Sequence, residues 1–579
     1  MQAVSRHPAL EQAFKVCKRA FLRVGVFSIF TNLLMLTPIF YIMNVFRHAV
    51  ASKSMPTLTV LIMIAVIMYV ALACLEWVRS RLLQQLAARA DAAISPEIYS
   101  LSVQANAGVI DADLGVQPLN ALAKLKQFVT SPQALTFFDL PFLPLYLMLM
   151  LAFHPHLFLV AIVCCVILAI VAFLNQSATT EKFKSSASTQ NRIANATQIS
   201  LRNAEVITAL GMTDCLRQSW SKSQEASLKT LDEANSDSAK FSAITKCLSM
   251  AMQSAAITTG AILVINQQIA PGAMIGAALL LGRTLAPIQA GVSGWRQYVD
   301  TWTHYCALRD LLNNFNDQAS RMSLPPITGQ MLALRATVTP PGAQKPVLAD
   351  VSFKAGPGAV TMVVGPSGSG KSTLARMVLG IWPTVQGEMR LNGAIASHYD
   401  REELGPQLGY LPQDIELFSG TIAQNIARFG DIDSEAVIKA AKLARVHRMI
   451  LKLPEGYDTE ISADGGGALS PGQRQRIALA RAVYGSPSLV VLDEPNSNLD
   501  ADGEAALFDA ISELKKAKCS VMIISHREGL MPLVDKVVEL SNGSVVDQGQ
   551  KEKYLERRVQ RLQTEEDSSK NVRQLVRHE

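Results

Sequence analysis

The sequence is poor in charged residues for its length. Aspartate, glutamate, lysine and arginine make up 18% of the 579 residues, whereas hydrophobic residues make up 49% and the mean hydropathy is +0.20. Soluble domains usually carry about 25% charged residues, so we expect part of the chain to lie in a membrane. The formal net charge is only +6, and the basic residues are spread along the chain. Nucleic acid is therefore not expected as a partner.

Cysteine pairs are also missing. The eight cysteines form no C-x-x-C pair, and several lie inside apolar runs, where they behave as small hydrophobic residues. They support neither a disulfide framework nor a zinc site. The first twenty residues contain Glu11 and no short apolar core followed by a cleavage site, so we expect no signal peptide.

Apolar runs long enough to cross a membrane fall almost entirely before residue 295. A helix needs about 20 apolar residues to cross the hydrocarbon layer. Six segments reach or approach this length, and they cover residues 24–45, 57–77, 134–153, 157–174, 248–265 and 273–292. Buried core helices are the alternative, but six such runs in half of a chain argue against it. We predict an all-α transmembrane domain of six helices over residues 1–312, embedded in the lipid bilayer.

Basic residues in the connections predict the orientation of these spans. The stretch before the first span and the two long connections, residues 79–133 and 175–247, carry many lysines and arginines. The three short connections hold only Arg47 and Lys53 between them. Both termini are therefore predicted to face the cytoplasm.

The composition and the hydrophobic pattern of the chain change beyond residue 312. Residues 313–329 form a predicted linker, and the proline and glycine around it are typical of linkers and turns. Over residues 330–550, short β-branched runs alternate with helical stretches, which predicts an α/β domain with a largely parallel sheet. Residues 551–579 are polar with mixed charge, and we predict a solvated helix and a frayed tail, without an assigned role.

A glycine-rich loop separates a strand from a helix in the stretch VTMVVGPSGSGKSTLARMVLG. This G-x-x-x-x-G-K-S sequence is the phosphate-binding P-loop, in the context that it requires. Lys371 would reach the β- and γ-phosphates of a nucleotide, and the Ser372 hydroxyl would bind Mg²⁺. Backbone N–H groups would surround the β-phosphate, aided by the helix N-terminus. The predicted nucleotide-binding residues of the loop are Gly365, Pro366, Ser367, Gly368, Ser369, Gly370, Lys371, Ser372 and Thr373.

Four further polar residues are predicted to act on the same nucleotide. Asp493 and Glu494 follow a hydrophobic strand, and ligands bind at the carboxyl ends of parallel strands. Asp493 is placed to hold Mg²⁺ through water, and Glu494 to polarise the attacking water. Gln413 supplies a neutral amide that could reach Mg²⁺ or the water. His526 follows a later strand, where its imidazole could contact the γ-phosphate.

A second helix start lies about a hundred residues after the P-loop, in DGGGALSPGQRQRIALARAV. Ser470 occupies the N-cap position and Pro471 the first helical position. The free N–H groups of such a helix start attract an anion. The residues alone do not say which anion, because the P-loop already surrounds the phosphates of one nucleotide.

Together these motifs resemble the ATP-binding cassette (ABC) family. The P-loop, Gln413, LSPGQ, LVVLDE, SNLD and His526 stand in the order and spacing of that family over roughly residues 330–550. With six spans in front, the chain resembles an ABC exporter half-transporter. The resemblance implies ATP and Mg²⁺ as cofactors, ATP hydrolysis and a homodimer.

The family also assigns roles to the second helix start. There the signature helix contacts the γ-phosphate held by the other chain, which implies this role for Ser470, Gly472 and Gln473. Asp500, in the SNLD loop, matches the family's loop between the two nucleotide sites.

Two features depart from the family pattern. The signature usually reads L-S-G-G-Q, and Pro471 replaces the first glycine. Proline lacks an N–H donor but suits the first helical turn, so we expect the site to work. The family also places an aromatic residue about 25 positions before the P-loop, to stack on adenine, whereas RATVTPPGAQKP has none. We expect adenine to rest on aliphatic or proline surface.

Two stretches of the membrane half carry charge in unusual places. FFDLPFLPLYLML puts Asp139 in the third span, and GAMIGAALLLGRTLAPIQAGVSGWRQ puts Arg283 deep in the sixth. A charge at the bilayer centre costs on the order of 3 kcal/mol and normally marks a pathway or a pair. For Asp139, a partly hydrated position near the interface is the alternative. Both stretches resemble type I secretion ATPases, in the branch that exports metalloproteases, lipases and surface-layer proteins.

This resemblance implies export of an unfolded protein with an uncleaved C-terminal signal. The implied partners are a periplasmic membrane-fusion adaptor, an outer-membrane duct, the secreted protein and a second copy of the chain, in a bacterial inner membrane. About twenty residues precede the first span, so we expect no N-terminal peptidase-like domain. An ABC exporter of a small molecule, lipid or drug is the alternative. A non-transport ABC ATPase is disfavoured by the six spans.

Overall fold

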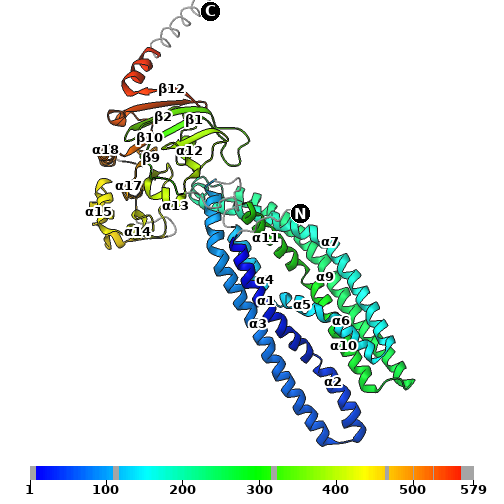
Figure 1. Cartoon of the computed structure of the whole chain (residues 1–579). Helices are drawn as coiled ribbons and strands as arrows, with labels where there is room; N and C mark the ends of the chain where they lie inside the picture. Colours follow the sequence, from blue (N-terminus) through cyan, green and yellow to red (C-terminus); the bar gives the residue numbers. More distant parts are fainter. Residues whose placement is uncertain are drawn as a thin grey trace, which may run out of the picture. The chain divides into compact units, whose positions relative to one another are not determined.

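The computed structural model describes residues 8–108, 117–314, 323–462, 469–497, 499, 501–525 and 527–561 (Figure 1). The chain forms two compact units, residues 1–102 with 114–317, and residues 103–113 with 318–579. Among the described residues the first unit is helical, and the second contains all the strands.

The helical unit consists of long apolar helices joined by short turns. Its helices are α1 (Pro8–Leu34), α2 (Thr37–Asn44), a π-helical turn (Val45–Val50), α3 (Met55–Asn106), α4 (Gln117–Val129), α5 (Pro132–Asp139), a 3₁₀ turn (Leu140–Phe142), α6 (Leu143–Phe153), α7 (Pro155–Arg202), α8 (Ala204–Ala209), α9 (Thr213–Ile265), α10 (Pro271–Ser293) and α11 (Trp295–Asn314). Proline is the first residue of α5, α7 and α10, a position that needs no N–H donor. Within the part of the chain that the structure describes, six helical stretches are long and apolar enough to cross a membrane: Phe21–Val50, Met55–Asn106, Pro132–Phe153, Pro155–Arg202, Thr213–Ile265 and Pro271–Ser293.

Three of these helices are much longer than a membrane is thick. α3, α7 and α9 contain 52, 48 and 53 residues, or about 70–80 Å at 1.5 Å per residue. The hydrocarbon layer is only about 30 Å thick. Each of these helices therefore continues well beyond the apolar span that it contributes.

The core of the helical unit follows a helical period. Leu157, Ala161, Cys164 and Leu168 on α7 are buried at intervals of three and four residues, facing apolar residues of α9 and α10. Gly260 allows α9 and α10 to approach closely, because a Cβ there would lie 2.7 Å from the Met274 side chain.

The second unit contains three sheets. In the six-stranded sheet the order is β12 (Ser544–Gln550), β11 (Lys536–Ser541), β3 (Val360–Val364), β10 (Ser520–Ile524), β9 (Leu489–Asp493) and β6 (Leu408–Leu411). Its pairs are parallel except for β11–β12. The four-stranded antiparallel sheet has the order β2 (Leu348–Ala355), β1 (Met331–Val338), β4 (Gln386–Leu391) and β5 (Ala394–Ile395). The third sheet is a short antiparallel pair of strands, β7 (Gly420–Thr421) and β8 (Glu460–Ile461).

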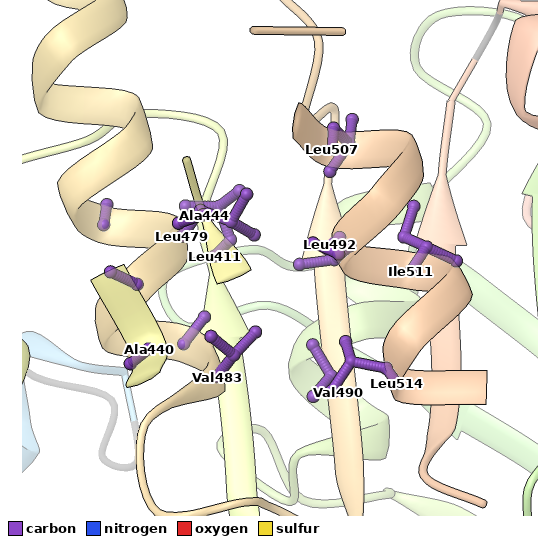
Figure 2. Close-up of a cluster of buried hydrophobic side chains, with 14 of the residues drawn as sticks. Leu411, Ala440, Ala444, Leu479, Val483, Val490, Leu492, Leu507, Ile511 and Leu514 are labelled. Atoms are coloured by element: carbon purple, nitrogen blue, oxygen red, sulfur yellow. The ribbon is translucent and has the colours of Figure 1, made fainter. Parts of the chain in front are cut away.

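Helices cover this parallel sheet. They are α12 (Lys371–Val378), α13 (Arg401–Leu404), α14 (Ile422–Ile426), α15 (Ser434–Leu443), α16 (His447–Ile450), α17 (Pro471–Val483) and α18 (Ala501–Lys516). All residues of β9 and β10 are buried, as expected for strands covered on both faces. Val490 and Leu492 point into the cluster that Figure 2 shows, with Leu507 and Ile511 of α18. The alternating residues Leu489 and Val491 of β9 belong to a second cluster of buried hydrophobic side chains.

Residues 551–561, within the stretch predicted as a solvated helix and frayed tail, are helical. Tyr554 is buried in the same core as β9, and Arg557 forms an ion pair with Asp547 at 2.7 Å. Arg561 forms a further ion pair with Glu539 at 3.2 Å. This segment therefore packs on the second unit. The predicted fold class, a helical membrane domain followed by an α/β NTPase domain, is confirmed.

Candidate functional site

The P-loop connects β3 to α12, and two of its glycines, Gly365 and Gly370, are required by close contacts. Gly365 has φ 152°, and a Cβ there would lie 2.1 Å from the Leu540 carbonyl oxygen. Gly370 has φ 96°, and a Cβ there would lie 2.7 Å from the Leu348 side chain. Both positions therefore exclude a side chain, which keeps the loop backbone accessible to phosphate.

Lys371 is the first residue of α12 and is folded into the loop. Its Nζ donates hydrogen bonds to the carbonyl oxygens of Gly365 at 3.0 Å and Pro366 at 2.9 Å. Burial lowers the pKa of Lys371, and the negative charges of Glu494 and Asp493 oppose that shift. The ammonium group is thus held where the P-loop pattern places the phosphates.

Asp493 ends β9 and faces the start of α12. Its side chain is buried, one carboxylate oxygen (Oδ1) has no hydrogen-bond partner, and a hydrogen bond links it to Ser372. Burial raises the pKa of Asp493, and Glu494 adds to the rise, whereas Ser372 lowers it. A buried carboxylate oxygen without a partner, beside a hydroxyl, suits a hard cation that prefers oxygen ligands. These residues therefore fit Mg²⁺.

Glu494 and Gln413 come together from the ends of two strands. Gln413 follows β6, and its Nε2 donates to a carboxylate oxygen of Glu494 at 3.0 Å. Glu494 has φ 48°, a left-handed conformation that costs of order 1 kcal/mol or more for such a residue. Its backbone N–H donates to the carbonyl oxygen of Ile524 at 2.9 Å, which holds that conformation. Such conformations cluster at active sites, although Glu494 is one of twelve non-glycine residues with positive φ among the described residues.

The predicted second helix start is present as α17. The Ser470 hydroxyl accepts from the Gln473 N–H at 3.3 Å, and the Gln473 side chain accepts from the Ser470 N–H at 2.9 Å. This reciprocal pair is a capping box. Pro471 occupies the first helical position without loss of a hydrogen bond.

Gln475 was not singled out from the sequence. Its side chain is buried, and its Nε2 donates to the carbonyl oxygen of Pro495, the residue after Glu494. This hydrogen bond ties α17 to the end of β9. A glutamine inside a helix gives no sequence signal of such a role. His526 and Asp500 lie outside the described residues.

Asp139 is paired within the helical unit. Its Oδ1 lies 2.8 Å from Nη1 of Arg79 and accepts from Nδ2 of Asn32 at 2.9 Å. The Tyr146 hydroxyl donates to Oδ1 of Asn32 at 2.7 Å. Arg79 is only 2% exposed. Asp139 therefore forms a pair in this structure, and its partner Arg79 was not identified from the sequence.

Arg283 has a different environment. It is exposed on α10, and its Nη1 lies 3.8 Å from the sulfur of Met35. Among the described residues no carboxylate forms an ion pair with it. The charge of Arg283 is thus not paired in the way that the charge of Arg79 is.

Comparison with known proteins identifies the class. Residues 348–497 match the family "ABC transporter", and residues 21–287 match "ABC transporter transmembrane region". The fold resembles a solved bacterial Atm1-family ABC exporter with ATP bound, with a TM-score of 0.81, 18% sequence identity, and coverage of 94% of this chain and 97% of that one.

Two relatives narrow the class. The chain is 39% identical to the type I secretion system ATP-binding protein PrsD of Rhizobium meliloti, over 97% of this chain and 96% of that protein. It is 25% identical to the leukotoxin translocation ATP-binding protein LktB of Mannheimia haemolytica, over 93% of this chain and 77% of that protein. The chain belongs to the ABC transporters and, within them, to the type I secretion system ATP-binding proteins. It binds and hydrolyses ATP and is a multi-pass inner-membrane protein.

The connection between β1 and β2 bears on recognition of the base. Residues 339–347 contain no aromatic residue, and the Ala343 N–H donates to the Pro340 carbonyl oxygen at 3.1 Å to form a turn. Without base stacking, we expect similar KM values for ATP and GTP. Since base–aromatic stacking stabilises by about 1–3 kcal/mol, Pro340→Tyr should lower the KM for ATP at least about fivefold. Steady-state hydrolysis kinetics measure the KM values for ATP and GTP. Pro346→Tyr, at an exposed position of the same connection, is the control. An unchanged KM in Pro340→Tyr would place the base elsewhere.

Proposed function

We propose that this protein drives ATP-dependent export of an unfolded polypeptide with a C-terminal signal, as the inner-membrane component of a type I secretion system. The observation that carries the proposal is the 39% identity to PrsD, which extends through the membrane half as well as the cassette. Matches to a mycobactin importer and a lipid A-core flippase cover only 36% and 37% of this chain. These shorter matches are compatible with a cassette shared by many transporters.

Hydrolysis rests on residues that lie at the ends of parallel strands. Glu494 polarises the attacking water, and Gln413, 3.0 Å away, orients its carboxylate. Lys371 and the P-loop N–H groups bind the phosphates. Ser372 and Asp493 would hold Mg²⁺, which when bound neutralises phosphate charge and orients the γ-phosphate. For His526 we propose a contact with the γ-phosphate, as its place after β10 suggests.

The start of α17 supports a homodimer. Ser470, Gly472 and Gln473 stand at the positive end of the α17 helix dipole, where the capping box uses the Ser470 and Gln473 N–H groups. The chain's own P-loop would already surround one set of phosphates. We assign these residues to the γ-phosphate of the second copy's nucleotide, with Asp500 in the loop between the sites. Two cassettes would then enclose two ATP molecules.

The remaining assignments concern the orientation of the chain in the membrane and its partner proteins. We place both termini in the cytoplasm, on the basis of the lysines and arginines in the long connections. The partners are a periplasmic membrane-fusion adaptor, an outer-membrane duct and the exported protein.

The test is reconstituted ATPase activity in lipid vesicles with candidate exported proteins and with peptides from their C-termini. We expect a specific, saturable change in ATPase rate of about twofold or more, with scrambled peptides of the same composition as the control. A response to lipids or small amphiphiles, with none to any polypeptide, would favour the small-molecule or lipid exporter instead.

A further inference from the structure

Two histidines flank Pro155 at the turn between α6 and α7. His154 is the N-cap of α7, and His156 is the second residue of that helix. Their rings are nearly parallel, with an interplanar angle of 28°. The two Nδ1 atoms lie 3.2 Å apart, whereas the ring centroids lie 4.9 Å apart. The two nitrogens are therefore on the edges that the rings turn toward each other.

The backbone of the turn brings the two rings together. A proline restricts the residue before it to extended conformations, and His154 has φ −168° and ψ 140°. The ring of Pro155 fixes its own φ at a value that suits the first position of a helix. His156 then stands in the first turn of the 48-residue helix α7. The arrangement of the imidazoles thus follows from three consecutive residues.

Hydrogen bonds account only weakly for the two facing nitrogens. A neutral imidazole has one N–H donor and one acceptor nitrogen. Nδ1 of His154 accepts from the backbone N–H of His156 at 3.2 Å, and a hydrogen bond between the two Nδ1 atoms would have the same length. Both distances are at the long limit for an N–H donor. The Nδ1 lone pair of His154 therefore has two donors near it and a short bond to neither.

The distance between the nitrogens matches that between two ligands of one metal ion. Imidazole nitrogens bind Zn²⁺ at about 2.0–2.1 Å. With such bonds, two nitrogens lie about 3.3–3.4 Å apart in a tetrahedral site and about 2.8–3.0 Å apart at the right angle of a tetragonal Cu²⁺ site. The observed 3.2 Å lies between these values. The spacing of the pair therefore needs only a small adjustment for the nitrogens to share one ion.

The turn is open to water. Pro155 and His156 are exposed, and the apolar stretches of α6 and α7 meet at this turn, so it stands at a membrane surface. The proposed orientation of the chain makes this surface the periplasmic one. Among the described residues no group of three His, Cys, Asp or Glu side chains is suited to hold a metal ion. The other positions around an ion at the pair would therefore be taken by water or by an added ligand.

We propose that His154 and His156 bind one divalent transition-metal ion, Cu²⁺ or Zn²⁺, through their Nδ1 atoms. Imidazole suits both ions, and Cu²⁺ is bound more tightly than Zn²⁺ at a given site. Mg²⁺ and Ca²⁺ prefer oxygen ligands. The ion replaces the two long hydrogen bonds and ties the residue before α7 to the first turn of that helix, which fixes the connection between two membrane spans. The site does not depend on the nature of the exported molecule.

The test is calorimetric titration of the full-length protein in phosphatidylcholine nanodiscs with Cu²⁺ and, separately, with Zn²⁺. The double variant His154→Asn, His156→Gln should bind both ions at least about tenfold more weakly, since even changes around the ligands of a metal site cost about 10–100-fold. Asparagine is a good N-cap residue, so the start of α7 is preserved. The control is His48→Gln, at a single exposed histidine of the turn Val45–Val50, which should bind like the wild type.

Two further measurements locate the ion. Diethylpyrocarbonate modifies accessible imidazoles, and mass spectrometry reports the modification of each peptide. Either ion should protect the peptide with His154 and His156 and leave the peptide with His48 unprotected. Electron paramagnetic resonance of the Cu²⁺-loaded protein should show coupling to two nitrogen nuclei, which the double variant should lose.

Three outcomes would overturn the proposal. Equal affinities of the wild type and the double variant for both ions would mean that the ions bind elsewhere. Equal protection of His48 and of the pair would reduce the binding to that of single exposed imidazoles. The single variant His154→Asn keeps the helix cap but removes one ligand, so wild-type affinity in this variant would leave the pair with a capping role alone.

Discussion

Glu494→Gln should abolish ATP turnover while preserving ATP binding. The carboxylate that polarises water is replaced by an amide of the same shape, and loss of a general base lowers rates by about 10²–10⁴. The P-loop and Lys371 do not depend on that carboxylate for their geometry, because Lys371 is held by the carbonyl groups of its own loop. Phosphate release and equilibrium binding of a fluorescent ATP analogue measure the two properties separately.

The matched control is Glu402→Gln. Glu402 is exposed on α13, and its backbone N–H rather than its side chain takes part in the helix cap with Asp400. This variant should hydrolyse ATP at the wild-type rate. Near-normal turnover in Glu494→Gln would remove Glu494 from the catalytic role and leave Gln413 without a function beside it.

Asp139→Ala should strongly destabilise the helical unit. Arg79 is almost fully buried and its short ion pair is with Asp139. Removing one partner of a buried pair typically costs about 3–5 kcal/mol. Because Glu76 still lies 3.4 Å from Nη2 of Arg79, we expect a loss at or below the lower end of that range. Thermal unfolding of the detergent-solubilised protein should show a clear loss of stability. Asp232→Ala, an exposed acid of α9, should change the free energy of unfolding by no more than about 0.5 kcal/mol.

A double variant distinguishes a structural pair from a transport residue. Arg79→Met with Asp139→Leu replaces both charges by apolar groups of similar size, which is often neutral or stabilising. We expect it to recover most of the stability lost in Asp139→Ala. If the double variant is as unstable as the single variant, the pair is not the source of the stability. If it is stable but does not export, Asp139 has a role beyond Arg79.

Local patterns were enough to predict much of the cassette. The P-loop context and the capping residues of α17 involve neighbours within four positions. A short stretch of sequence is therefore enough to predict their geometry. The apolar run of β9 likewise indicated a strand of a largely parallel sheet. These are features that a few adjacent residues determine.

Contacts between distant residues were not predictable in the same way. Asp139 and Arg79 are 60 positions apart on different helices, and nothing near Arg79 marks it as a partner. Gln475 reaches Pro495 across the fold through a side chain that is ordinary for a helix. The largely apolar cavity of the helical unit is lined by residues of α4, α5, α7, α10 and α11, from Leu125 to Tyr305, so its lining residues form no motif along the chain.

The length of α7 and α9 has a mechanical consequence. Neither helix has a proline beyond its first residue, so neither contains the common cause of a kink. A tilt of about 5° at one end of a rod about 75 Å long moves the other end by about 6–7 Å, more than one helical turn. Each helix therefore acts as a lever. A small rotation at one end displaces the other end far enough to change the contacts of its side chains.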